Sequence, residues 1–229
     1  CCGSTCSDGD RPPQSRYTSV GLERRVQSSE MESQDSILGF WFGDELDEAA
    51  VAAELASLWW SKEPAMDAEI RRRFESLVIA AGVGELEQWR SSIRGRLALV
   101  LLTDQFSRSI YRGTPAAFAF DAIARSMCLE SLADGSDRKL RPIERVFLYL
   151  PLEHSESLDD QDRSVELFRA LAAEVEPRLT PMFEDYLDYA LRHRAIVERF
   201  GRFPHRNALL GRESTAEEVE ALEHPAYRF

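Results

Sequence analysis

The stretch at residues 192–212 concentrates side chains that can bind anions. It carries six arginines and two histidines against a single acid, Glu198, in a chain whose net charge is −12. Arginine presents a fixed fork of N–H donors that suits carboxylates and phosphates, so we expect an anion-binding site here. The alternative is that these arginines bond helix carbonyl groups and surface acids. The expected ligand-binding side chains are His193, Arg199, Arg202, His205, Arg206 and Asn207.

A second polar group follows Pro151, where a helix is expected to break. Imidazole and carboxylate groups at a helix break suit a general base, so we assign catalytic roles to Glu153 and His154. Glu156 and Gln161 are assigned to ligand binding. The spacing matches no zinc motif, which needs two histidines on one helical face. The alternative is a capped, solvated helix junction.

A third group continues the most apolar helix of the chain. Asp104, Arg108 and Arg112 are spaced four residues apart and share one helical face. An unpaired buried carboxylate costs several kcal/mol, so Asp104 must meet a cation or hydrogen-bond donors, and Arg108 is one turn away. We expect Asp104, Gln105, Arg108 and Arg112 to belong to a ligand site. The alternative is an internal ion pair that ties helices together.

These three segments would form one pocket if they converge in space. Such a pocket would be an anion site with acid–base capacity. Its expected lining is Arg108, Arg112, Arg199, Arg202 and Arg206, beside Glu153, His154, Glu156, His193 and His205.

The elements that position these residues are all predicted to be helices, because alternating strand patterns are absent and β-branched residues are sparse. Proline and capping signals place the helix boundaries, and a capping box is expected at Ser214 and Glu217. The short connections favour antiparallel neighbours, so we predict one all-α domain of stacked helical hairpins over residues 36–229. The expected helical segments are 37–42, 44–60, 64–81, 92–111, 115–134, 142–150, 158–175, 181–200 and 214–222.

The first 35 residues differ in composition from the rest. They are rich in Ser, Gly, Pro and Arg and lack a hydrophobic period, so we predict a disordered tail. Three of the four cysteines lie in this tail, which favours a reducing compartment for the folded part. We predict a cytoplasmic protein, with a plastid or mitochondrial location as the alternative if residues 1–30 are a targeting remnant.

The acidic balance of the chain argues against nucleic-acid binding and against an anionic membrane surface, because both need a basic face. No apolar run approaches the roughly 18 to 20 residues of a membrane span. The expected partner is therefore an anionic small molecule or a peptide.

The same motifs carry a resemblance to a known family. The strings DQFSRSIYRG, FLYLPLEHSE and RFGRFPHRN, with LGRESTAEE, resemble the bacterial domain-of-unknown-function family 924 over residues 36–223. The resemblance implies an all-α fold similar to tetratricopeptide repeats, with hairpins around a groove. It implies no activity, cofactor or catalytic residue. The sequence departs from the family pattern at Thr103, Ser107 and Ser109.

Three functions stay open. The first is a helical-hairpin module that binds an anionic small molecule or peptide. The second is a hydrolase or transferase that acts on an anionic metabolite with Glu153 or His154 as base, and a divalent metal on Glu153, Glu156 and a histidine is one version of it. The third is a scaffold with a buried polar network. The sequence identifies neither a cofactor nor an oligomeric state.

Overall fold

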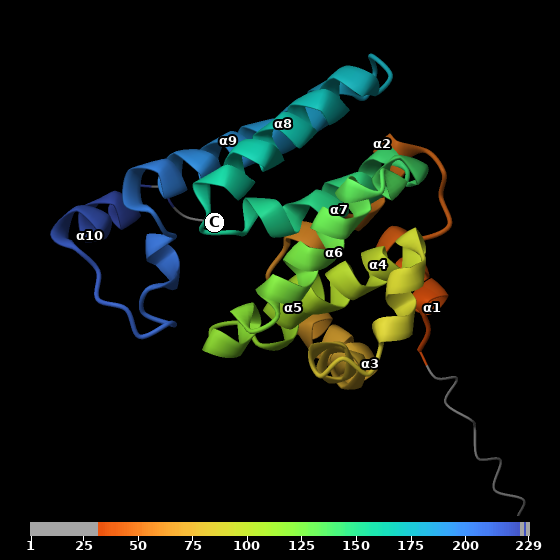
Figure 1. Cartoon of the computed structure of the whole chain (residues 1–229), viewed down its shortest axis with the longest axis horizontal. Helices are drawn as coiled ribbons and strands as arrows, with labels where there is room; N and C mark the ends of the chain where they lie inside the picture. The colour runs from red at the N-terminus through yellow and green to blue at the C-terminus, as the bar shows by residue number, and fades with distance from the viewer. Residues whose placement is uncertain (1–31, 225–226, 228–229) are drawn as a thin grey trace, which may run out of the picture. The chain divides into compact units, whose positions relative to one another are not determined.

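The computed structural model describes residues 32–224 and residue 227, and the chain from Glu32 onward forms one compact unit. The described residues form helices and no strands, which confirms the all-α prediction (Figure 1). Residues 1–31 of the predicted tail lie outside the described residues, and the first helix begins at Gln34.

The α-helices follow one another with short turns between them. Their bounds are α1 Gln34–Phe42, α2 Glu48–Trp60, α3 Pro64–Gly82, α4 Ile93–Val100, α5 Ser107–Ile110, α6 Asp121–Ala133, α7 Pro142–Glu153, α8 Leu158–Glu174, α9 Thr180–Phe200 and α10 Ala216–Glu223. The shorter helical segments are η1 Glu87–Ser91, η2 Leu101–Phe106, η3 Pro115–Phe118, η4 Ser136–Lys139 and η5 Pro204–Arg206.

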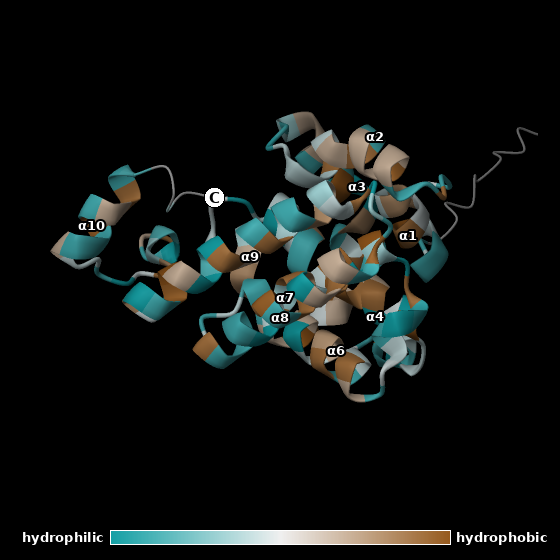
Figure 2. Ribbon diagram, turned by 90° about the horizontal axis from the view of Figure 1, so that it is seen from above, coloured by the Kyte–Doolittle hydropathy of each residue, from teal (hydrophilic) through white to brown (hydrophobic). Residues whose placement is uncertain are grey.

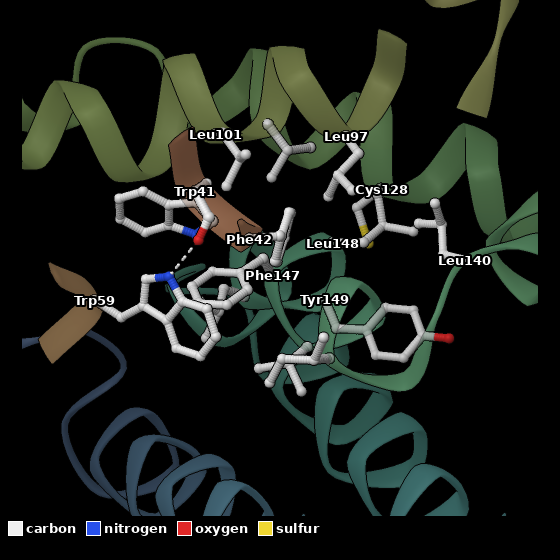
Figure 3. Packing of buried hydrophobic residues seen from close by; sticks show 14 of the residues in the cluster. Trp41, Phe42, Trp59, Leu97, Leu101, Cys128, Leu140, Phe147, Leu148 and Tyr149 are labelled. Carbon is white, nitrogen blue, oxygen red and sulfur yellow. Dashed lines mark hydrogen bonds between the residues drawn. The ribbon is translucent and has the colours of Figure 1, made fainter. Parts of the chain in front are cut away.

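The core lies where α1, α4 and α7 meet. Leu97 to Leu102 are all buried, which confirms that this apolar helix is surrounded by others. Aromatic rings fill the space beside it: Trp41 and Phe42 contact Phe147 edge to face. The indole Nε1 of Trp59 donates a hydrogen bond of 2.8 Å to the carbonyl oxygen of Trp41 inside this cluster (Figure 3). The core therefore fixes α2 against α1 and α7.

Two long helices, α8 and α9, form a hairpin. α8 and α9 are joined by a short turn and lie side by side (Figure 1), and α7 packs against α8. Hydrophilic and hydrophobic residues alternate along α9, as expected for a helix with one buried face (Figure 2). Among the described residues, no helix combines the length and the apolar character that a membrane crossing requires.

Several predicted helices differ in detail from the observed ones. The segment predicted as one helix after Thr114 is split into η3 and α6, because Phe120 leaves helical geometry. The ring of Phe120 packs so closely over Gly82 that a Cβ at Gly82 would clash with it. Pro151 does not end α7, which continues to Glu153. Burial of this entire turn outweighs the lost helical hydrogen bond.

The last helix is capped one residue later than predicted. The hydroxyl of Thr215 accepts from the backbone N–H of Glu218, and the Glu218 carboxylate accepts from the Thr215 N–H at 2.7 Å. The predicted cap, Ser214, instead accepts a hydrogen bond from the side chain of Asn207 at 3.0 Å. Its expected partner Glu217 pairs with Arg199 at 2.7 Å.

Candidate functional site

A cavity of about 850 Å³ lies between α2 and α9 and reaches the C-terminal turn of α7. Alanines of α2 leave the space open on one side, and an aromatic stripe of α9 lines the other. Its polar end holds Glu153, His154 and His193. The full lining is Ala49, Ala52, Ala53, Trp60, Lys62, Leu150, Glu153, His154, Phe168, Met182, Asp185, Tyr186, Tyr189, Arg192 and His193.

Glu153 is the buried carboxyl group of this cavity, with only 4% of its surface exposed. Burial, and then the charge of Asp104, raise the pKa of Glu153 to about 8. Its Oε1 lies 3.1 Å from Nδ1 of His193, which also lies 2.9 Å from the carbonyl oxygen of Tyr189. Burial lowers the pKa of His193 to about 3, so the ring is neutral at neutral pH and its Nδ1–H donates to the Tyr189 carbonyl oxygen. Glu153 accordingly carries a proton near pH 7.

His154 is held by Asp104. Nδ1 of His154 lies 2.8 Å from Oδ1 of Asp104, so this nitrogen donates and Nε2 keeps its lone pair. Burial lowers the pKa of His154 despite the opposing charge of Asp104. Burial alone would raise the pKa of Asp104, but Arg108 and His154 together hold it below its ordinary value. The result is an ionised carboxylate that orients a neutral imidazole.

Asp104 reaches this position from a π-helical segment. In η2 the N–H of Ser107 donates to the carbonyl oxygen of Leu102, five residues earlier. The hydroxyl of Thr103 bonds the Leu99 carbonyl at 2.6 Å, and that of Ser107 bonds the Thr103 carbonyl at 2.8 Å. π-Helical turns often occur at functional sites because they re-aim side chains. Here Thr103 and Ser107 satisfy backbone groups of the wider turn.

A layer of buried and half-buried charges lies next to the Asp104–His154 pair. Arg108 bonds Asp104 at 2.9 Å and the two oxygens of Asp121 at 3.0 and 3.1 Å. Arg206 lies between the rings of Phe118 and Phe203, with Nη1 3.6 Å from Asp121. Burial, and then Arg108, lower the pKa of Arg206 to about 10. These arginines are thus bound to acids and aromatic rings and are absent from the cavity lining.

The chain is similar to known proteins in both sequence and structure. A family model described as "Bacterial protein of unknown function (DUF924)" matches residues 37–226. The chain belongs to this family. A solved structure of a protein of unknown function, ATU0120 from Agrobacterium tumefaciens, is 39% identical, with a TM-score of 0.64. The match covers 77% of this chain and 99% of that one. No curated protein matches the chain.

Several predicted site residues of this family member lie around the cavity. Ring contacts link three histidines. The ring centroids of His154 and His193 lie 6.2 Å apart. The ring of Phe203 joins His193 to His205, with centroid distances of 5.6 and 5.5 Å. Burial, and then Arg206, lower the pKa of His205 to about 4. Gln105 bonds Asp104 at 2.5 Å. The structure thus brings parts of all three sequence motifs together.

Other predicted site residues form hydrogen bonds within the protein near the C-terminal end of α7. Nε2 of Gln161 donates to the carbonyl oxygens of Glu153 and Ser155 at 2.6 and 2.7 Å, which satisfies the end of the helix. Glu156 accepts from two nitrogens of Arg212 at 2.7 and 2.9 Å. The side-chain oxygen of Asn207 accepts from Nε of Arg212 at 2.9 Å. These contacts join the C-terminal segment to α7.

Three of the predicted arginines lie away from the cavity. Arg112 pairs with Asp67 at 2.7 Å and lines a different hollow, between α3 and α5. Arg199 pairs with Glu217, and Arg202 bonds Glu218 at 2.7 Å. None of the five arginines in the expected pocket lines the cavity between α2 and α9. The expected five-arginine lining is therefore corrected: acids within the fold take these guanidinium groups instead.

The sequence did not single out half of the cavity. Tyr186, Tyr189 and Arg192 recur at helical spacing along α9, and that spacing marks one face. The sequence spacing could show that these side chains share one face of a helix. It could not show that this face lines a cavity. Among the described residues, no three His, Cys, Asp or Glu side chains are arranged to hold a metal ion. In particular, Glu156 is engaged by Arg212 rather than directed at Glu153.

Proposed function

We propose that the chain binds a small amphipathic anion in the cavity between α2 and α9. The observation that carries the proposal is that one cavity combines an aromatic wall with two basic side chains and three buried or half-buried acid–base groups. Ligand sites are concave and largely apolar, with a few polar groups that fix orientation. The helical-hairpin architecture supports the same proposal, because proteins of tetratricopeptide type bind in grooves between helices.

The aromatic wall supports a flat or apolar ligand body. Trp60 is 48% exposed, although it stacks on Phe147 with ring centroids 5.6 Å apart. Tyr189 is 49% exposed on the facing helix. Large aromatic side chains exposed on both sides of a cavity would bury additional apolar surface when a ligand enters.

The charges of the cavity support an anionic group on that ligand. Lys62 and Arg192 line it together with the acid Asp185, while burial raises the pKa of Glu153 to about 8 and keeps its proton on. Arg192 lies over the ring of Tyr189 with a separation of 5.0 Å. A carboxylate or sulfonate placed beside Tyr189 would therefore meet a guanidinium already positioned by that ring.

Titration with 8-anilinonaphthalene-1-sulfonate tests this proposal, because the probe is an aromatic anion whose fluorescence rises in apolar sites. We expect saturable binding of one molecule per chain. Ala52→Phe should weaken it by narrowing the cavity on the α2 side. Arg192→Ala should weaken it about tenfold, since one charge-assisted hydrogen bond is worth about 1.5 kcal/mol.

Arg199→Ala is the matched control, because Arg199 lies on the same helix but pairs with Glu217 outside the cavity. The control should bind the probe as the unmodified chain does. Equal weakening by Arg199→Ala and Arg192→Ala, or undiminished binding to Ala52→Phe, would contradict the proposed site. Thermal denaturation of each variant verifies that the fold is retained.

A further inference from the structure

The polar end of the cavity presents a neutral base next to a neutral acid. His154 is fixed through Nδ1 by Asp104, at 2.8 Å, so its Nε2 is the nitrogen that can accept a proton. Arg108 and Gln105 fix Asp104 in turn, at 2.9 and 2.5 Å. A base oriented by a second group in this way needs no rearrangement before a proton transfer.

Glu153 supplies the acid. Its carboxyl group lines the same cavity and contacts His193 at 3.1 Å. Because burial keeps its proton on at neutral pH, it can donate to an oxygen atom on which negative charge develops. The two groups follow each other in the chain at the end of α7, so one rigid turn positions both.

We propose that the cavity interconverts the keto and enol forms of 2-oxo acids that carry an aromatic or apolar side chain. This inference rests on the proposed function, since it names the amphipathic anion and the reaction. The carboxylate of the substrate would meet Arg192 and Lys62, and its side chain would lie against Trp60 and Tyr186. Its carbonyl group and adjacent CH₂ group would then lie at Glu153 and His154.

The reaction balances without a co-reactant. Nε2 of His154 takes a proton from the CH₂ carbon, and the electrons of that C–H bond form the carbon–carbon double bond. The carbonyl π electrons move to oxygen, which takes the proton of Glu153. Transfer of one proton from the imidazolium to the Glu153 carboxylate restores both groups. The reverse sequence converts the enol into the keto form.

Phenylpyruvate is the probe for this reaction, since it is an aromatic 2-oxo acid. We would measure deuterium exchange at its CH₂ group in D₂O by NMR with the full chain, and measure its binding by calorimetry. We expect saturable acceleration over buffer. His154→Gln should lower kcat by about 10²-fold or more, the usual contribution of a general base, and leave KM nearly unchanged.

Asp104 is a positioning residue, so Asp104→Asn should lower kcat with little change in KM. Because Asp104 is wholly buried, its replacement also perturbs folding, so the half-buried His154 carries the decisive variant. The activity should fall above about pH 8 as Glu153 loses its proton, and Glu153→Gln should lack that decline. The charged and titratable groups around the pair are Asp104, Arg108, Asp121, His193, His205 and Arg206.

The outcomes separate this inference from the binding proposal. Phenylpyruvate that binds but exchanges at the buffer rate would overturn the inference and leave the binding proposal standing. Acceleration that persists in both His154→Gln and Glu153→Gln would place the chemistry elsewhere and also overturn it. Arg199→Ala should exchange as fast as the unmodified chain. Failure of both phenylpyruvate and the fluorescent anion to bind would overturn both proposals.

Discussion

Asp104 connects the candidate site to the fold at the scale of single residues. Its carboxylate is wholly buried and contacts both His154 and Arg108. A buried charge is tolerated only with such partners, and removal of one partner leaves the others uncompensated. The sequence predicted the Arg108 contact from helical spacing. It could not predict the His154 contact, because those residues lie 50 positions apart.

Replacement of Asp104 should therefore destabilise the protein strongly. Asp104→Ala is expected to lower the free energy of unfolding by about 3–5 kcal/mol, because it removes a buried carboxylate that pairs with both Arg108 and His154. Arg112→Ala is the control, since the Arg112–Asp67 pair is partly exposed and should contribute about 0–1 kcal/mol. Urea unfolding of both variants makes the comparison. Equal losses of unfolding free energy in Asp104→Ala and Arg112→Ala would show that the contacts of Asp104 do not stabilise the fold as proposed.

Glu153 should make stability depend on pH. Its folded pKa of about 8 lies above its ordinary value of 4.5, so the folded chain binds a proton that the unfolded chain releases between these values. The stability contributed by protonated Glu153 is thus present below about pH 4.5 and is lost as the pH rises to about 8.

Comparison with Glu153→Gln isolates this effect from the other titrating groups. The unfolding free energy of the unmodified chain, minus that of the variant, should decrease as the pH rises from about 4.5 to 8. Chemical denaturation at several pH values measures the difference. A constant difference across this range would show that Glu153 has an ordinary pKa in the folded protein.

Helices are the scale at which sequence prediction succeeded most. Apolar periodicity, proline positions and capping residues located the helices because these signals are local. The deviations have tertiary causes. The π-helical turn at η2 forms where Thr103 and Ser107 hydroxyls bond nearby carbonyl groups, and α7 passes through Pro151 because its neighbours bury it. Local rules carry no information about such packing.

A close backbone approach gives a test at this scale. Gly95 in α4 lies against the carbonyl oxygen of Trp89, and a Cβ there would fall far inside van der Waals contact with that backbone atom. Gly95→Ala should displace η1 from α4 and lower the melting temperature by many degrees. The matched control is Gly39→Ala in the exposed face of α1, where a Cβ meets no atom within 4 Å.

Gly39→Ala should raise stability by up to about 1 kcal/mol, because alanine has the higher helix propensity. Thermal denaturation followed by circular dichroism compares the two variants. A stable Gly95→Ala protein would contradict the contact between η1 and α4.

At the scale of the whole molecule, segments distant in the sequence meet at one cavity. The sequence marked Glu153, His154 and His193 by residue type, and the structure places all three at its polar end. Residue type alone could not show that these three residues line the cavity while the predicted arginines pair with acids within the fold. That distinction depends on which acids lie opposite: Glu217 meets Arg199, and Glu218 meets Arg202.

The most direct test is a crystal structure of the chain grown with 8-anilinonaphthalene-1-sulfonate. The proposed function predicts the probe between α2 and α9, its rings against Trp60 and Tyr189 and its sulfonate near Lys62 and Arg192. The hollow between α3 and α5 is of similar size, about 840 Å³, and serves as an internal comparison. A probe found only in that hollow, with the cavity between α2 and α9 left empty, would contradict the account.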